Sequence, residues 1–463
     1  MAVLFTIEFL FGFWMFFILY WLVAPLPKVQ NGLLLLGGYY FVYHISAYSL
    51  LILLSWSLCV WLLVKLAQKR KCGSAATALL VLLMLGYFIA FKYWMPLADW
   101  LRGVLESLNA SWPLPVVEIL LPLGLSFYLF NSLSLVRSVA KREIAPPDLL
   151  SVLLYVSFIP TLVAGPVNRA VDLMPQIRAA RRHVLDLKTA FCLIALALIK
   201  LFLLSTWLCD TLVNPVFNQP AEHSGWETVI GVYGWAWNIY LNFSGYTNLV
   251  TGLGMLLGYR LPKNFAHPYA AASLQAFWHR WHISLSNFIR DYIYFPLGGS
   301  RKGMSRTQIN VLLAMVISGL WHGAGVNFML WGAIHGVGLI IYNLWRAWRP
   351  RPLPETLARL LTFHYVCLAW IFFRAESVED AWVLLHNIQS CSLLTLTSAQ
   401  MWSIAAFILL VVFYPRLVNL RLRAVEMVSV IRWYAIPFII VPVLTFAFFF
   451  APSGVPGFIY ANF

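Results

Sequence analysis

Charged side chains are scarce in this sequence. Only 11% of its 463 residues are Asp, Glu, Lys or Arg, whereas 61% are hydrophobic. A soluble domain normally has about a quarter of its residues charged. The apolar residues also stand in long blocks, for example 149–165, 191–208 and 437–451. A helix needs roughly 20 mostly apolar residues to cross a bilayer, and the pattern gives about ten to thirteen candidate spans. The composition therefore predicts an all-α, polytopic integral membrane protein.

Acidic residues are fewer still, because 17 Asp and Glu stand against 32 Lys and Arg and give a net charge of +15. The basic residues stand in short clusters at the ends of apolar blocks. Cytoplasmic loops of membrane proteins carry such an excess of Lys and Arg. We therefore expect these loops in the cytoplasm, and membrane lipids rather than nucleic acid as the surroundings of the chain. The clusters are residues 69–71, 137–142, 178–182, 301–306, 346–351 and 416–423.

The first apolar block, residues 1–24, lacks the features of a cleaved signal peptide. It has no basic start, it contains Glu8, and no small-x-small site precedes Pro25. We expect a retained first span. With the loop at 69–71 and Lys28 on the inner side, the N-terminus is predicted to lie outside.

Paired cysteines and metal-ligand motifs are also lacking. The six cysteines are scattered and none forms a CxxC pair, so a disulfide or zinc framework is not expected. His279 and His282 are spaced i, i+3, but the run is not HExxH and no carboxylate or cysteine stands at ligand spacing. We expect no bound metal.

Internal repeats and long linkers are absent, and no soluble module is evident. We expect residues 1–463 to form a single membrane domain. Between residues 242 and 336, Gly, Pro, Asn, His and Arg repeatedly interrupt the apolar sequence. Irregular backbone at membrane depth is tolerated only where protein or a water-filled cavity surrounds it. The region of about residues 240–340 is therefore predicted to hold the functional core.

His322 follows a tryptophan in the apolar run GLWHG, residues 319–323. An ionisable residue inside a membrane span is by default a functional candidate. A neutral imidazole in a dry pocket can take a proton from a hydroxyl or thiol, and this general-base role is the one we expect. The alternative is a histidine that merely ends a helix.

A second histidine lies in the amphipathic stretch 273–296, which we expect to be one helix. At 100° per residue its large apolar side chains share one face. His282 then stands at the edge of the apolar stripe, whereas His279 points into the polar face. For His282, orientation of a substrate, stabilisation of an oxyanion and proton transfer all stay open. His335 is more typical of a packing histidine.

Further polar and aromatic residues are expected around these histidines. Asn242, Ser244 and Tyr246 form a polar segment, which otherwise marks a helix break satisfied by its own side chains. Asp291 directly follows Arg290, which indicates a structural ion pair or phosphate positioning. The residues expected to line a substrate tunnel are Trp278, Trp281, Trp321, Asn242, Ser244, Tyr246, Arg290 and Asp291.

With these motifs in view, the chain resembles the membrane-bound O-acyltransferase family, and within it the bacterial branch that acetylates cell-envelope polysaccharides. The matching segments occur in order along nearly the whole chain. They are residues 121–128 (LPLGLSFY), 164–166 (AGP), 242–246 (NFSGY), 258–265 (GYRLPKNF), 277–299, 319–323, 370–375 and 458–463.

The resemblance implies a ring of tilted helices around a central tunnel in the bacterial inner membrane. It implies that His322 is catalytic and that His282 is the second active-site position. It also implies acetyl-CoA as the acyl donor and a separate periplasmic SGNH-type O-acetyltransferase as partner. Alginate acetylation proteins carry Asp where this chain has Asn242 and Asn248. The resemblance therefore favours peptidoglycan as the acceptor, with alginate or another exopolysaccharide as the alternative.

Three rival functions stay open at this stage. The first is transfer of D-alanyl or another acyl group. The second is a membrane transporter with intramembrane His and Asn as a relay, which predicts an internal repeat and paired intramembrane acids. The third is a structural platform, which would tolerate loss of both histidines.

Overall fold

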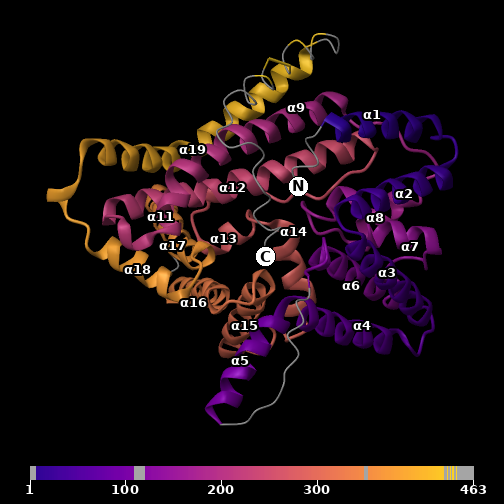
Figure 1. The fold of residues 1–463 in the computed structure, drawn as a ribbon, viewed down its shortest axis with the longest axis horizontal. Helices are drawn as coiled ribbons and strands as arrows, with labels where there is room; N and C mark the ends of the chain where they lie inside the picture. Colours follow the sequence, from indigo (N-terminus) through magenta and orange to yellow (C-terminus); the bar gives the residue numbers. More distant parts are fainter. Residues whose placement is uncertain are drawn as a thin grey trace. The chain divides into compact units, whose positions relative to one another are not determined.

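A computed structural model describes residues 7–108, 120–348 and 353–431, together with the isolated positions 435, 438, 441, 442 and 445. Every regular element within these residues is a helix (Figure 1). The predicted all-α class is confirmed. The C-terminal motif at 458–463 and most of the apolar block 437–451 lie outside the described residues.

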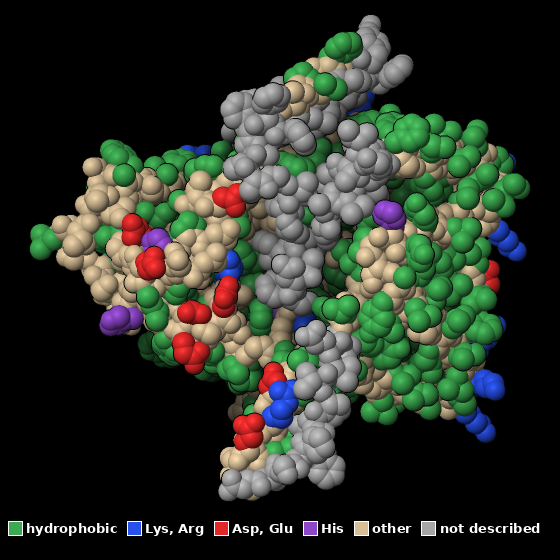
Figure 2. All heavy atoms as spheres, in the orientation of Figure 1, with side chains coloured by type: hydrophobic (Ala, Val, Ile, Leu, Met, Phe, Trp, Pro, Cys, Tyr) green, Lys and Arg blue, Asp and Glu red, His purple; other side chains and the backbone are tan. Residues whose placement is uncertain are grey.

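Six of the described helical segments are long and apolar enough to cross a membrane. Two shorter apolar segments, Phe11–Leu22 and Leu149–Thr161, accompany them. The prediction of a multi-pass membrane protein is confirmed, and apolar side chains cover much of the face shown in Figure 2. Fewer helices meet these criteria than the ten to thirteen blocks in the sequence, because several blocks form short or polar-interrupted helices. The six segments are Ala47–Ala67, Gly73–Ser107, Leu187–Asn218, Val326–Trp348, Glu355–Arg374 and Ser398–Leu417.

The chain divides into two compact units. We call Val3–Leu185 with Leu253–Pro262 the N-terminal unit, and Asp186–Gly252 with Lys263–Phe463 the C-terminal unit. A single domain over residues 1–463 stays a prediction. The N-terminal unit contains α1 (Ile7–Leu22), α2 (Pro27–Ile45), α3 (Ala47–Ala67), α4 (Gly73–Phe88), α5 (Trp94–Ser107), α6 (Leu125–Ala140), α7 (Leu149–Val156) and α8 (Ala170–Ile177).

Within the N-terminal unit, α3 packs against α2, α4, α6 and α7. A buried guanidinium holds neighbouring segments together. Arg182 donates to Gln30 Oε1 at 3.0 Å, to Asn31 Oδ1 at 2.5 Å and to the Ile177 carbonyl at 2.7 Å, and its guanidinium lies 4.8 Å from the ring centroid of Tyr259. The sequence placed Arg182 in a cytoplasmic basic loop, but its side chain is buried and serves as a structural cross-link. Its neighbour Arg181 is exposed.

Three basic loops of the N-terminal unit lie close together. Gly73, which follows the loop at 69–71, packs against Ala140 at the end of α6. Arg178 donates to the carbonyls of Ala145 at 3.0 Å and Pro146 at 2.6 Å, just beyond the cluster at 137–142. The positive-inside pattern requires these loops to share one side of the membrane, and the contacts agree with it.

The C-terminal unit holds the remaining helices, several of which are interrupted by π-helical turns. These turns are Ile199–Ser205, Cys209–Val213 and Arg290–Tyr294. The α-helices are α9 (Leu187–Leu198), α10 (Thr206–Leu208), α11 (Asn214–Asn218), α12 (Gly225–Leu256, whose last turn enters the N-terminal unit), α13 (Leu274–Trp278), α14 (Ile283–Ile289), α15 (Met304–His322), α16 (Val326–Trp348), α17 (Glu355–Arg374), α18 (Val378–Gln389) and α19 (Ser398–Val430).

Helices α15 and α16 approach each other closely through glycines. A Cβ atom at Gly319 would meet the Phe328 carbonyl, and one at Gly332 would meet the Met315 carbonyl. Small residues allow such close contact between helices in a membrane, where there is no hydrophobic force between them. This packing fixes the C-terminal end of α15, where His322 lies.

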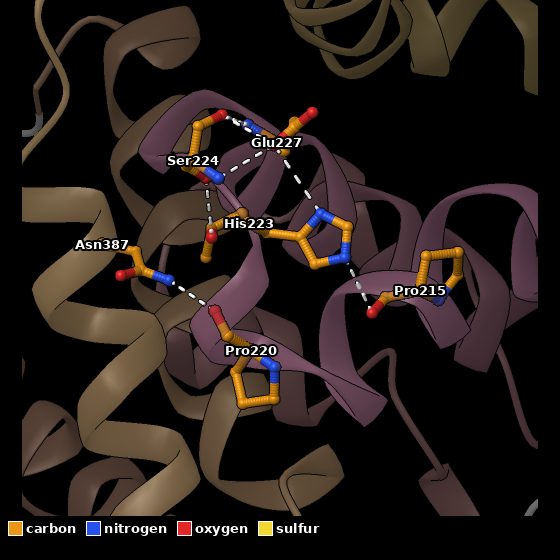
Figure 3. A network of polar contacts seen from close by, with 7 residues as sticks. Pro215, Pro220, His223, Ser224, Glu227 and Asn387 are labelled. Atoms are coloured by element: carbon orange, nitrogen blue, oxygen red, sulfur yellow. Dashed lines mark hydrogen bonds and ion pairs between the residues drawn. The ribbon is translucent and has the colours of Figure 1, made fainter.

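The N-terminus of α12 is held by a capping box. Ser224 donates its backbone N–H and its hydroxyl to Glu227 Oε2, each at 2.8 Å (Figure 3). His223 Nδ1 lies 3.6 Å from the same carboxylate, and Asn387 of α18 donates to the Pro220 carbonyl at 2.8 Å. Such contacts satisfy orphan N–H groups of the first helical turn. They define where α12, the helix that carries Asn242, Ser244 and Tyr246, begins.

Candidate active site

The stretch 273–296 is not one helix, so that prediction is wrong. It forms α13 (Leu274–Trp278), a turn, α14 (Ile283–Ile289) and a π-helical end. The break occurs at His282, whose φ of 41° places its backbone in the left-handed region. A non-glycine residue in this region is strained, and such strain concentrates at functional sites.

A neighbouring extended segment holds the strained turn on both sides. The N–H of Ile283 donates to the Asn264 carbonyl, and the N–H of Ala266 donates to the Arg280 carbonyl, each at 2.9 Å. These long-range bonds compensate for the interrupted helix. They clamp the backbone immediately before and after His282.

The same asparagine contacts the imidazole. Asn264 Oδ1 lies 3.0 Å from His282 Nδ1, and it also accepts from the Ser284 hydroxyl at 2.8 Å. Both His282 and Asn264 are 1% exposed. His282 lies outside the six candidate spans, and complete burial lowers the pKa of its imidazole to about 3, so the ring is neutral at pH 7.

The predicted division of faces holds despite the break. Phe277, Trp281 and Leu285 are buried on the apolar side, whereas His279 is exposed. His282 therefore points into the protein interior and His279 does not, as the sequence predicts.

His322 is the last residue of α15 and is 3% exposed. Its ring lies 4.5 Å from the ring of Trp321, 5.0 Å from that of Trp331 and 5.1 Å from that of Phe373, measured between centroids. Three aromatic rings therefore border the imidazole, and a neutral imidazole is the form that accepts a proton.

The ring of Trp321 lies near both candidate histidines. Its ring centroid lies 6.4 Å from that of His282 and 4.5 Å from that of His322. Phe243 of α12 packs edge-on against His282 at 4.7 Å. The structure thus brings together the two histidines and Trp321, all within the C-terminal unit.

Of the two other predicted tryptophans, Trp278 packs against His335. The ring of His335 lies 5.0 Å from Trp278 and 5.0 Å from Trp331, and Phe277 stacks on it at 6.2 Å. Trp281 packs instead on Trp370 at 5.1 Å. His335 is completely buried in this aromatic cluster, which agrees with a packing role.

The polar segment of α12 is buried, and its role in lining a tunnel stays a prediction. Asn242 and Ser244 are each 2% exposed, and Tyr246 is 1% exposed. This segment is not a helix break, because α12 continues through it. Ser244 Oγ accepts from Lys200 Nζ at 2.9 Å.

Lys200 is a buried residue that the sequence prediction missed. It is 8% exposed and lies in the π-helical turn Ile199–Ser205 of a candidate span. A signal was available, because Lys200 is the only charged residue in the apolar block 191–208. An ionisable residue inside a span is a functional candidate.

Arg290 and Asp291 pair with each other. Arg290 Nε lies 2.7 Å from Asp291 Oδ1, and Arg290 Nη2 lies 3.2 Å from Asp291 Oδ2. The predicted ion pair is present at the start of a π-helical turn. Among the described residues, no group of three or more His, Cys, Asp or Glu side chains could hold a metal ion.

Comparison with known proteins identifies the family of this fold and site. The family model of the membrane-bound O-acyltransferases (MBOAT) matches residues 33–378. The chain belongs to the membrane-bound O-acyltransferase family. The matched region includes both candidate histidines, and the resemblance predicted from the motifs is confirmed.

Three relatives illustrate the range of the similarity. A probable alginate O-acetylase AlgI of Azotobacter vinelandii is 35% identical over 72% of this chain and 66% of its own length. A peptidoglycan O-acetyltransferase of Helicobacter pylori is 30% identical over 61% of this chain and 60% of its own. A teichoic acid D-alanyltransferase of Bacillus subtilis is 28% identical over 55% of this chain and 69% of its own. The matches to the alginate and peptidoglycan relatives cover less than two thirds of the relative's length.

Proposed function

We propose that this chain is an O-acetyltransferase that takes acetyl groups from cytoplasmic acetyl-CoA and passes them on for O-acetylation of a cell-envelope polysaccharide. The placement of His322 carries the proposal: it is a buried imidazole at a helix end, next to Trp321, whose ring also lies 6.4 Å from that of the second buried histidine. The family membership and the names of the relatives support the reaction class.

In the proposed reaction, His322 acts as the general base. It takes the proton of an acceptor hydroxyl while the hydroxyl oxygen attacks the acetyl carbonyl carbon. The carbon–sulfur bond of the thioester then breaks. The thiolate of coenzyme A leaves with the proton from the imidazolium, and an O-acetyl ester remains on the acceptor. His282 is the second active-site residue.

The basic loops of the N-terminal unit support entry of the donor from the cytoplasm. Coenzyme A carries phosphate groups, which Arg and Lys side chains bind through charge-assisted hydrogen bonds. The loops at 69–71, 137–142 and 178–182 bring several such side chains to one edge of that unit. We propose that the chain spans the bacterial inner membrane with this edge inside.

The acceptor and the partner belong to the same proposal. A periplasmic SGNH-type O-acetyltransferase receives the acetyl group from this chain. Peptidoglycan is the final acceptor, and Asn242 and Asn248 favour it. An alginate-like exopolysaccharide is the second candidate, and the higher identity to the alginate relative, 35% against 30%, supports it. Because one relative is a teichoic acid D-alanyltransferase, the identity of the transferred acyl group should be tested as well.

The test uses cells that lack the gene and are complemented with wild type, His322→Ala or His279→Ala. The His279 side chain is exposed and lies outside the aromatic cluster, so it provides a matched histidine control. We expect ester-linked acetate on the envelope polysaccharide with wild type and His279→Ala, and its loss with His322→Ala at equal protein level. Retained acetylation in His322→Ala would overturn the proposal. Separate assays of peptidoglycan and of secreted polysaccharide identify the acceptor.

A further inference from the structure

Asn264 makes three contacts with one side-chain atom. Its Oδ1 lies 3.0 Å from His282 Nδ1, 2.8 Å from Ser284 Oγ and 3.3 Å from the backbone nitrogen of Ser284. A neutral imidazole has one nitrogen that donates and one that accepts, and its partners decide which is which. The contacts of Asn264 therefore determine where His282 carries its proton.

The backbone N–H of Ser284 removes the ambiguity of the amide. An amide nitrogen and oxygen are hard to tell apart by shape, but a backbone N–H can only donate. The Asn264 atom that faces it must be the oxygen. Because that oxygen also faces His282 Nδ1, the imidazole nitrogen must be the donor. His282 then carries its proton on Nδ1 and its lone pair on Nε2.

Within the described residues, the side chain of Asn264 hydrogen-bonds to His282 and Ser284 and to no other residue. Asn264 Nδ2 is buried and has no hydrogen-bond partner among the residues that the structure describes. Buried asparagines usually satisfy both ends of the amide, because a buried donor left without a partner is destabilising. Only the oxygen of this side chain is used within the described part of the protein, and it is used at His282 and Ser284.

The backbone supports the same geometry. Asn264 and Ala266 clamp the turn around His282 with two backbone bonds of 2.9 Å each. The left-handed backbone of His282 is thereby held, and with it the direction of the ring. The main chain of Asn264 and Ala266 thus fixes the position of the histidine, and the side chain of Asn264 fixes its proton.

We propose that Asn264 is a positioning residue that selects the Nδ1–H tautomer of His282, so that Nε2 is a hydrogen-bond acceptor for a substrate donor other than the hydroxyl that His322 deprotonates. This assignment rests on the proposed acyl transfer at this site. Of the three roles that the sequence left open for His282, this assignment selects orientation of the substrate. A neutral His282 with this tautomer orients the substrate as a hydrogen-bond acceptor and does not donate to the oxyanion.

The tautomer is tested directly by ¹⁵N NMR of detergent-solubilised protein labelled at histidine nitrogens. Comparison with His282→Gln assigns the resonances of His282. The expected wild-type spectrum has a protonated Nδ1 and an unprotonated Nε2. A protonated Nε2 in the wild type would overturn the proposal. In Asn264→Ala we expect a shift toward the Nε2–H form, and an unchanged tautomer contradicts the assignment.

Kinetics provide the second readout. Asn264→Ala is expected to lower kcat by about tenfold or more, as loss of a partner that orients a histidine does, while KM for acetyl-CoA stays within about twofold. Asn310 is the matched control, because it is also a buried asparagine, and within the described part of the protein its side chain hydrogen-bonds only to the Gly299 carbonyl, at 2.9 Å. Asn310→Ala should keep kcat within about threefold. An equal loss of kcat in both variants would show a merely structural effect.

The NMR readout does not depend on turnover. Unchanged acetyl transfer in His322→Ala would defeat the proposed function while the tautomer of His282 could still be as described. A wrong tautomer would defeat the role of Asn264 while acetyl transfer still required His322. The two failures are therefore distinguishable.

Discussion

The indole of Trp321 lies near two histidines that are 40 positions apart in sequence, with its ring centroid 6.4 Å from that of His282 and 4.5 Å from that of its neighbour His322. His282 follows a short helix, whereas Trp321 and His322 end a long one. This convergence places both imidazoles in one buried region of the C-terminal unit. The stability of the elements that carry them can be tested separately from the reaction.

The contact between α15 and α16 should depend on Gly332. A methyl group there would meet the backbone of Met315, so Gly332→Ala is expected to lower stability by about 1–3 kcal/mol, the usual cost of overpacking. Gly86 in α4 is the control, since no atom lies within 4 Å of a Cβ built there. Gly86→Ala should change stability by no more than about 1 kcal/mol. Equal melting temperatures for the two variants in detergent would contradict the close approach.

The buried guanidinium of Arg182 should be essential to the N-terminal unit. Arg182→Met leaves the acceptors on Gln30 and Asn31 without their donor, and each unsatisfied group costs about 1–3 kcal/mol. We expect a clear fall in the thermal unfolding temperature. The matched variant Arg181→Met alters an exposed side chain and should stay within about 0.5 kcal/mol of wild type. A similar effect of both substitutions would argue against the cross-link.

The capping box at α12 predicts a pH-dependent stability. Hydrogen bonds from the backbone N–H and the hydroxyl of Ser224 hold the pKa of Glu227 below its usual value. A lowered folded-state pKa means that the stabilisation is present above the unfolded pKa of about 4.3 and is lost as the pH falls through the folded value. Glu227→Gln should therefore destabilise by about 0.5–1 kcal/mol at pH 7, with a smaller difference from wild type below about pH 4.

Glu222 provides the control for this experiment, because it is an exposed carboxylate in the same loop. Glu222→Gln should leave the melting temperature nearly unchanged at both pH values. If Glu227→Gln lowered the melting temperature equally at pH 7 and pH 4, the ionised carboxylate of Glu227 would not be the source of the stabilisation.

Much of this fold could be predicted from local sequence, because burial in a membrane protein follows composition and periodicity. The apolar blocks predicted the helices, and the 3.6-residue period separated His282 from His279 correctly. The break at His282 could not be predicted in this way. No glycine or proline stands at residues 279–282, and the turn is held by Asn264 from a different segment.

Long-range contacts also explain the other features of the structure that the sequence did not predict. Arg182 belongs to a basic cluster in sequence, and only the packing of α2 against its loop shows that its charge is buried. Lys200 was visible as an isolated charge, but its contact with Ser244 required the pairing of two helical segments. The aromatic residues around His335 are individually ordinary in a membrane protein. Their gathering around one imidazole is a property of the fold.

The central claim is tested most directly with purified protein in proteoliposomes, supplied with labelled acetyl-CoA and its partner transferase. Acetyl transfer should proceed in the wild type and in His279→Ala. It should fall by about 10²–10⁴-fold in His322→Ala, the range expected for loss of a general base. Transfer at the wild-type rate by a folded His322→Ala protein would contradict the account.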